Sequence, residues 1–439
     1  MATWTTGECT KEQAAVNRQK LEAGEKPPAA DLYIDEGLRL PSNSVFDGNG
    51  CRLHQPFYTS TFGRNCVLNL QGEDPLGYGN ASTFAGSTAT PQNPAKFKVG
   101  DVCWSSVWAG YVTGEQNCRR HIVQHTDGTR VQLDSTPHPK ANVLNWATGG
   151  KPVYKLQRGE TMAYVVGAPQ FPVGSYVYVT DAQAIADGRH GEIRRVITRS
   201  KTQLIFDRPL CCTFDPNLSA VVPLQPLANV TVRNVSLHVT DPSIYTSAFA
   251  NFSDGVIFDN VSANSTVWFI NSTRGMLVHC DAGQFAFNAS VDCRLTTCRA
   301  PLWNCEEGCA AIDALDLTLD GSPAWLNAVN WGIGGEDIRM RQSKIINSNG
   351  CPLLVTGERS VVEHLSISGS KSPQTPCYIG GDQLRVDSIK ADCGLVFQNG
   401  LAMTVLGCRS PGIALQESAG GMAVDSQSIY FKGSKWVAQ

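Results

Sequence analysis

The sequence predicts an all-β protein: a parallel β-helix solenoid with one N-terminal capping helix and an inserted small β module. Short apolar segments recur about every 19 to 26 residues from position 229 onward. Each segment is too short to bury its own apolar face, so successive copies must stack to make a core. Glycine makes up 41 of the 439 residues and no long helical pattern accompanies the repeat, which favours short strands.

Residues 1–55 are expected to form the capping helix and the first strands of the β-helix. Thr10 and Gln13 have the spacing of a helix capping box, and Gly24 ends the apolar pattern, so the helix is expected over 10–24. Residues 31–51 alternate short apolar segments with turn residues such as Gly48 and Gly50, a pattern typical of β-strands.

Residues 56–215 are expected to form an insertion that contains an internal repeat. The segment 97–134 resembles the segment 171–207: each opens with a Val-Gly turn and closes with an apolar strand that ends in Asp. Two copies of one small β module explain this similarity most economically.

Residues 216–439 are expected to form the coils of the β-helix. Most repeats carry apolar residues at their first and third positions, and they lack the fixed Leu-x-x-Leu-x-Leu spacing of leucine-rich repeats, the structural alternative. Aligning the repeats predicts two columns of outward residues. Within each column, residues of successive coils would lie one strand spacing apart, about 4.8 Å. One column contains Asp316, Arg339, Val362 and Arg385, and the other contains Thr318, Arg341, His364 and Asp387. Such a face is either a solvated surface of neutralising charges or a polar trough for an extended glycan.

These features together resemble the right-handed parallel β-helix superfamily of pectate-lyase-like proteins and bacteriophage tailspikes. The resemblance rests on the capping helix, the turns at 41–43 and 47–50, the Val-Gly modules and the coils. The segments 173–179, 191–196 and 204–210 are especially similar to a module of phage-encoded β-helices.

The resemblance implies a homotrimeric receptor-binding protein of a phage tail. Such a protein recognises bacterial surface polysaccharide, in some cases cleaves it, contacts phage tail or adaptor proteins, and is assembled in the host cytoplasm to act outside the cell as part of the virion. Two alternatives stay open: a free polysaccharide lyase or glycoside hydrolase of the same fold, and a non-enzymatic structural virion protein. If the protein is an enzyme, hydrolysis is favoured, because the columns mix charges and do not cluster Asp as Ca²⁺-dependent lyases of this fold do.

Glycoside cleavage needs two carboxyl groups about 5 to 9.5 Å apart. Carboxylates are densest in the segment 301–340. The candidate catalytic residues there are Glu307, Asp316 and Asp320. Asp316 and Asp320 would face the same way on one strand about 13 Å apart, so each would need a partner from another coil or loop.

The same segment contains three tryptophans, Trp303, Trp325 and Trp331, whose rings offer flat apolar faces to a sugar. The alternative is that these rings pack under loops or at a subunit interface. Together with Arg339, Arg341 and His364 from the polar columns, they form the predicted substrate-binding set.

Several classes of partner and cofactor are not expected. The net charge of −3 argues against nucleic-acid binding, and no apolar run is long enough to insert into a membrane. The beginning of the sequence lacks a secretory leader, so reduced thiols are expected. A metal held by Cys298, Cys305 and Cys309 with His279 is the less favoured reading of the cysteines, which we expect to be buried apolar residues. No metal and no cofactor is therefore predicted.

Overall fold

The computed structural model describes residues 3–57, 65–106, 118–147, 149–167, 170–185, 188–241, 243–306, 308–321, 331–372, 374–398, 402–416 and 429–432. These residues form two compact units. One contains residues 1–71 and 227–439, and the other contains residues 72–226. The sequence had suggested an insertion over 56–215.

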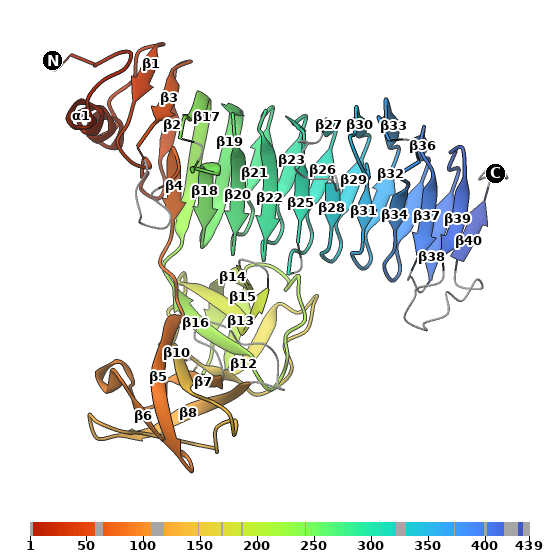
Figure 1. Cartoon of the computed structure of the whole chain (residues 1–439). Helices are drawn as coiled ribbons and strands as arrows, with labels where there is room; N and C mark the ends of the chain where they lie inside the picture. The colour runs from red at the N-terminus through yellow and green to blue at the C-terminus, as the bar shows by residue number, and fades with distance from the viewer. Residues whose placement is uncertain are drawn as a thin grey trace. The chain divides into compact units, whose positions relative to one another are not determined.

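The first unit is a parallel β-solenoid with one helix, α1 (Lys11–Glu22), at its N-terminal end (Figure 1). Thr10 caps the helix: its hydroxyl accepts from the backbone N–H of Gln13, and the Gln13 side chain accepts from the backbone N–H of Thr10. This reciprocal pair confirms the predicted capping box. No helix in the described parts of the chain is long and apolar enough to cross a membrane.

Each full coil of the solenoid contributes strands to stacked parallel sheets (Figure 1). The first sheet has 13 strands: β1 (Asp31–Tyr33), β2 (Val45–Asp47), β3 (Arg52–Gln55), β17 (Leu227–Val239), β19 (Ser253–Ala263), β21 (Met276–Val278), β23 (Arg294–Thr296), β26 (Asp313–Leu315), β29 (Arg339–Arg341), β32 (Val361–Glu363), β35 (Arg385–Asp387), β38 (Met403–Leu406) and β40 (Ile429–Lys432). The second sheet has 10 strands: β4 (Leu68–Gln71), β18 (Thr246–Asn251), β20 (Thr266–Ile270), β22 (Gln284–Asn288), β25 (Trp303–Cys305), β28 (Trp331–Ile333), β31 (Leu354–Val355), β34 (Cys377–Ile379), β37 (Leu395–Gln398) and β39 (Ile413–Gln416). The third sheet has 5 strands: β24 (Arg299–Ala300), β27 (Thr318–Asp320), β30 (Lys344–Ile346), β33 (Ser366–Ser368) and β36 (Lys390–Ala391).

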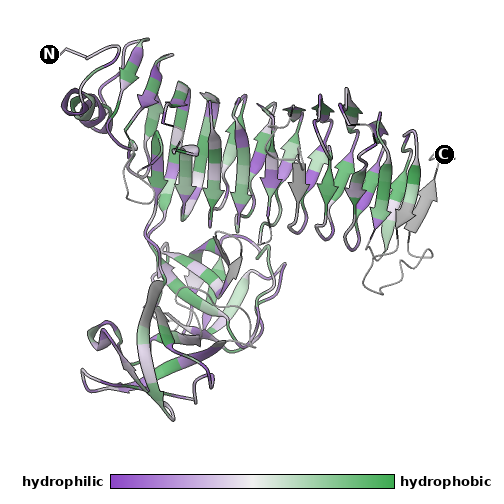
Figure 2. Cartoon of the chain, viewed as in Figure 1, coloured by the Kyte–Doolittle hydropathy of each residue, from purple (hydrophilic) through white to green (hydrophobic). Residues whose placement is uncertain are grey.

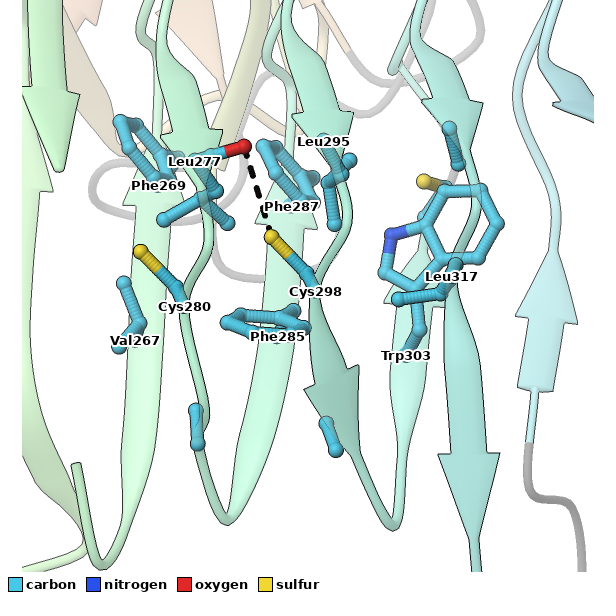
Figure 3. Close-up of a cluster of buried hydrophobic side chains, with 14 of the residues drawn as sticks. Val267, Phe269, Leu277, Cys280, Phe285, Phe287, Leu295, Cys298, Trp303 and Leu317 are labelled. Atoms are coloured by element: carbon cyan, nitrogen blue, oxygen red, sulfur yellow. Dashed lines mark hydrogen bonds between the residues drawn. The ribbon is translucent and has the colours of Figure 1, made fainter. Parts of the chain in front are cut away.

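Alternation along these strands builds the core. The middle residue of a short first-sheet strand, such as Leu277, Leu295 or Val362, is buried, and its two neighbours are at least partly exposed. Figure 2 shows the resulting interleaving of apolar and polar positions along the solenoid strands. Inside, the rings of Phe269 and Phe287 stack with centroids 5.3 Å apart (Figure 3). The predicted all-β solenoid is therefore confirmed.

A single residue in the left-handed region bends the chain at the same corner of successive coils. It lies within β17 and β19 and directly after β21, β23, β26, β29, β32 and β35. The residues at this corner have φ between 51° and 58°: Asn234, Asn260, His279, Thr297, Asp316, Gln342, His364 and Ser388. All eight are polar, and three of them are Asn or Asp, for which this conformation costs little. From β23 onward the corner leads from the first sheet to the third, so residues after it begin a new face.

The second unit, residues 72–226, contains two small β modules. One is a closed barrel of β5 (Gly77–Ala85), β6 (Thr88–Pro91), β7 (Val102–Ser106), β8 (Cys118–Thr126), β9 (Val131–Leu133) and β10 (Val143–Ala147), with the 3₁₀ turn η1 (Pro94–Lys96) between β6 and β7. The other is a 6-stranded sheet of β11 (Lys151–Pro152), β12 (Met162–Val166), β13 (Tyr176–Ile185), β14 (Gly188–Arg199), β15 (Gln203–Phe206) and β16 (Ala220–Leu224).

Equivalent hydrogen bonds occur within each of the two modules. The backbone N–H of Gly100 donates to Val123, and that of Gly174 donates to Val196 at the matching place. The carboxylates of Asp134 and Asp207 each accept from the backbone of the neighbouring strand, at Ile122 and Arg195 respectively. These contacts match Val123 with Val196 and Ile122 with Arg195, so β8 and β14 occupy equivalent places in the two modules.

Candidate functional site

The structure separates the predicted catalytic carboxylates. Asp316 is the exposed corner residue after β26, and Asp320 ends β27, so they do not face the same way along one strand as predicted. Asp320 forms an ion pair with Arg299 and accepts a hydrogen bond of 2.9 Å from Asn347 Nδ2. These donors, Asn347 foremost, lower the pKa of Asp320, which opposes a role as general acid. Glu307 lies outside the described residues.

The predicted sugar platform at Trp303 is wrong. Trp303 is 0% exposed and belongs to the solenoid core, in register with Phe285 on the previous coil (Figure 3). It occupies an inward position of β25, so its ring faces no solvent. Trp331 lies in β28 in register with Trp303. Its side chain, like the whole of Trp325, lies outside what the structure describes.

The predicted polar columns are out of register. Arg339 pairs with Asp313 on one side and Val361 on the other, and Val361 pairs with Arg385. The coil that leads to Val361 is one residue shorter than the repeat used for the prediction, and a slip of one residue moves a side chain to the opposite face. Val362 is therefore buried. Asp316 belongs to the corner.

The second column changes in the same way. Arg341 aligns with Leu315 and Glu363, and Glu363 aligns with Asp387. His364 is an exposed corner residue, and Thr318 lies in the third sheet. Opposite charges do meet on this face, as Arg341 Nη2 lies 2.6 Å from Asp313 Oδ2. Each exposed pair of this kind stabilises the fold by about 1 kcal/mol at most.

A polar hollow of about 470 Å³ lies elsewhere, at the corner of the first coils. It crosses β17 and β19 at their corner residues and passes the ends of β2 and β21, four strands that stack side by side in Figure 1. We call it the corner groove, and its lining is Asp47, Asn49, Gly50, Asn234, Val235, Ser236, Asn260, Val261, Ser262, His279 and Asp281.

Side chains of successive coils hydrogen-bond to one another along the corner groove. Asn260 Nδ2 donates to Asn234 Oδ1 over 2.9 Å, and Asn234 Nδ2 donates to Asp47 over 3.2 Å. Ser262 donates to Ser236 over 2.7 Å. The backbone N–H of Asn49 and then the Asn234 amide lower the pKa of Asp47. The groove floor is therefore a fixed lattice with an ionised carboxylate at one end.

Other polar groups of the corner groove face solvent. Asn260 Oδ1 and the Asp281 carboxylate have no hydrogen-bond partner within the described part of the chain, and both residues are exposed. The His279 side chain is 62% exposed, and its Nδ1 lies 3.6 Å from Asp259 Oδ1. These groups supply acceptors and a donor to a ligand laid along the coils.

Reading of the sequence missed this groove. Asn234 and Asn260 end two aligned repeats, and the pattern Asp47-Gly48-Asn49-Gly50 precedes them in the chain. Asn at a fixed place after a strand marks a left-handed corner. That pattern could have located the groove, but the density of carboxylates and tryptophans in 301–340 drew attention away from it.

A hydrogen-bond chain in the second unit leads from buried Ser105 and His121 to the exposed residues Ser135 and Asp134. Ser105 Oγ and Ser135 Oγ each lie 2.8 Å from a ring nitrogen of His121, and Ser135 donates to Asp134 over 3.1 Å. A carboxylate only accepts, so Ser135 must accept from His121 Nδ1–H, and Nε2 must accept from Ser105. Ser105 is 0% exposed and His121 is 1% exposed, so substrate cannot reach this serine.

The cysteines considered as metal ligands lie in the solenoid interior. Cys298, Cys305 and Cys309 are buried in the core, and burial raises the pKa of Cys309 to about 12. In the regions that the structure describes, no three His, Cys, Asp or Glu residues are arranged to hold a metal ion, and no disulfide occurs.

Comparison with known proteins gives matches in structure alone. No family model matches the sequence, and no curated protein matches it. The chain is similar to the tailspike of Pseudomonas phage LKA1, with 13% identity, 97% and 74% of the two chains covered and a TM-score of 0.35. It is similar to the tailspike of Pseudomonas phage phi297, with 11% identity, 96% and 73% covered and a TM-score of 0.38.

A third similar structure is the tailspike of Acinetobacter baumannii bacteriophage AP22 in complex with capsular saccharide, with 10% identity, 95% and 76% covered and a TM-score of 0.28. The stacked sheets of this chain carry the structural conclusion by themselves. The fold is a parallel β-helix.

Proposed function

We propose that the protein binds bacterial surface polysaccharide along the corner groove, as the receptor-binding component of a phage tail. The observation that carries the proposal is the groove itself: a hollow of about 470 Å³ lined by amides, hydroxyls, carboxylates and an imidazole from successive coils. Sites for neutral polar ligands use a few fixed groups of these types to set orientation.

The spacing of the coils supports an extended ligand. Neighbouring parallel strands lie about 4.8 Å apart, close to the length of one sugar in an extended chain, so each coil can meet one residue of a glycan. The lattice from Asp47 to Asn260 fixes the groove before a ligand arrives. A preformed site loses less free energy to ordering on binding.

Recognition is favoured over cleavage at the residues considered. A glycosidase acid is a carboxyl group with a raised pKa. Hydrogen bonds lower the pKa of both Asp47 and Asp320 instead. A free hydrolase therefore remains the second candidate, and release of new reducing ends from a bound polysaccharide is the assay that would establish it.

Binding of purified surface polysaccharides, measured by calorimetry, tests the proposal. Asp281→Ala removes an exposed carboxylate of the groove, and we expect about tenfold weaker binding from one lost hydrogen bond to a charged group. Glu25→Ala removes an exposed carboxylate that follows α1 and should leave affinity unchanged. Equal affinities for the two variants, or no binding by the unaltered protein, would exclude the groove as the receptor site.

Assembly has its own test. Light scattering of the full chain should give the mass of a homotrimer if the protein works as a tailspike. A single-chain mass would favour a free polysaccharide-active protein over a virion component.

A further inference from the structure

One outward column of the corner groove continues along the whole described solenoid. Pairing between neighbouring coils aligns its members directly, and all are at least partly exposed. In order they are Arg52, Ser236, Ser262, Asp281, Arg299, Thr318, Lys344, Ser366, Lys390 and Arg409. One of the first four members is basic, whereas three of the last four are.

The basic residues of the last coils carry uncompensated charge. Arg299 forms an ion pair with Asp320, but Lys344, Lys390 and Arg409 have no ion-pair partner in the described regions. We call these three the basic rungs.

Nearby acidic side chains are already engaged. Arg385 lies 3.8 Å from Glu363 and 3.3 Å from Asp387, and Asp392 accepts a hydrogen bond of 2.6 Å from the Ser370 hydroxyl. Most arginines of the solenoid likewise have an acidic partner, for example Arg274 with Asp254. The basic rungs differ from that pattern, so their charge is available to a ligand.

The spacing of the basic rungs fits a regular polyanion. Lys344 and Lys390 are separated by the Ser366 coil, so their backbones lie two strand spacings apart, about 9.6 Å. Arg409 follows Lys390 after one spacing, about 4.8 Å. A glycan with one sugar per coil would present acidic groups on alternate sugars to the two lysines, and the hydroxyl of Ser366 would meet the sugar between them.

Resting on the proposed function, we propose that the groove takes an acidic polysaccharide whose sugars carry carboxylates. The neutral hydrogen-bonding groups of the first coils orient the chain, and the basic rungs pair with its carboxylates. Lysine and arginine both pair with carboxylates by charge-assisted hydrogen bonds. Attraction between exposed charges is screened by salt, so this part of the affinity must fall as ionic strength rises.

The test uses the full chain with heparosan and alginate, two uronic acid polymers, and with the carboxyl-reduced form of each. The variant combines Lys344→Gln, Lys390→Gln and Arg409→Gln. The variant would lose three exposed ion pairs with ligand carboxylates, so we expect about tenfold weaker binding of the acidic polymers. Binding of the carboxyl-reduced forms should change little. The matched control combines Lys11→Gln, Lys26→Gln and Arg294→Gln, which removes the same charge from exposed residues outside the column.

The outcomes separate the two proposals. Support requires that carboxyl reduction weakens binding and that only the variant in the basic rungs abolishes this difference. Equal binding of the native and reduced polymers, with loss in Asp281→Ala, would overturn the acidic ligand and keep the groove. Binding of neither form would overturn the acidic ligand, whereas the receptor site in the groove is overturned only by its own assay with surface polysaccharides. An equal loss in the matched control, or a preference for single-stranded DNA that depends on the basic rungs, would also overturn the assignment.

Discussion

Protonation of His121 should loosen the barrel of the second unit at mildly acidic pH. Burial lowers the pKa of His121 to about 4, and the charges of Arg119 and Arg120 act in the same direction, against an opposing effect of Asp134. Nε2 of the neutral ring accepts from Ser105, so a second proton would also remove that hydrogen bond. The folded state thus excludes a proton that the unfolded chain accepts.

The sign and size of the pH effect on folding stability follow from this difference in proton binding. Above pH 6.5 the ring is neutral in both states, and His121 adds no pH dependence. As the pH falls below 6.5, the unfolded chain gains a proton that the folded chain refuses until about pH 4, so stability decreases across this window. At pH 5 the loss is about 2 kcal/mol, which corresponds to about a 30-fold increase in the open population.

Native-state hydrogen exchange of the full chain, read by mass spectrometry on β7 and β8 and corrected for intrinsic rates, measures this opening. Exchange at pH 5 should be about 30-fold faster than at pH 8. His121→Gln should abolish this dependence, whereas His125→Gln, an exposed position on the same strand, should retain it. The same acid sensitivity in His121→Gln, or none in the unaltered protein, would refute the reasoning.

Three further comparisons of variants test the solenoid, each by urea unfolding of the full chain. Asn260→Ala should destabilise the fold by about 1 to 2 kcal/mol more than Asn260→Gly. Both variants lose the hydrogen bond to Asn234, but only alanine is strained at φ 53°. Equal losses of stability would show that this backbone strain is absent. Val362→Asp buries a charge, so it should abolish folding or lower the free energy of unfolding by more than about 3 kcal/mol. Val361→Asp lies on the outer face and should change that free energy by less than about 1 kcal/mol. The reverse order would favour the register predicted from the sequence. Phe287→Ala should cost about 3 to 5 kcal/mol by opening a cavity beside Phe269, and a smaller loss than that of Val361→Asp would contradict the stacked core.

Much of the solenoid could be predicted because local sequence patterns specify its repeat. An apolar residue flanked by polar ones, as at Leu295 between Arg294 and Thr296, specifies both a strand and its inward face. The helix was equally local, since the capping pair Thr10 and Gln13 is only three residues apart. These patterns require no knowledge of distant contacts.

Register and burial could not be predicted in the same way. The position of Val361 opposite Arg339 depends on how many residues the intervening loop takes up, and a period averaged over coils hides one missing residue. Trp303 illustrates the second difficulty: a tryptophan beside a turn suits a sugar platform or a core equally well. Only the alignment of its strand with Phe285 shows that it points inward.

The corner residues explain how structural and functional demands combine in the groove. A left-handed corner favours Asn, Asp or Gly, and a repeat that must turn in every coil therefore brings such residues into one column. Asn has two more properties that Gly lacks: its amide bonds to the next coil, as Asn260 does to Asn234, and it leaves a carbonyl oxygen facing solvent. The residue type that makes the turn possible thus also provides hydrogen-bonding groups at the spacing of the coils. In the last coils Ser388 and Gly407 occupy corner positions, and recognition there depends more on the neighbouring column of Lys344, Lys390 and Arg409. A ligand that spans both regions must therefore satisfy amide and hydroxyl groups at one end and cations at the other, which gives the bound chain a direction along the solenoid.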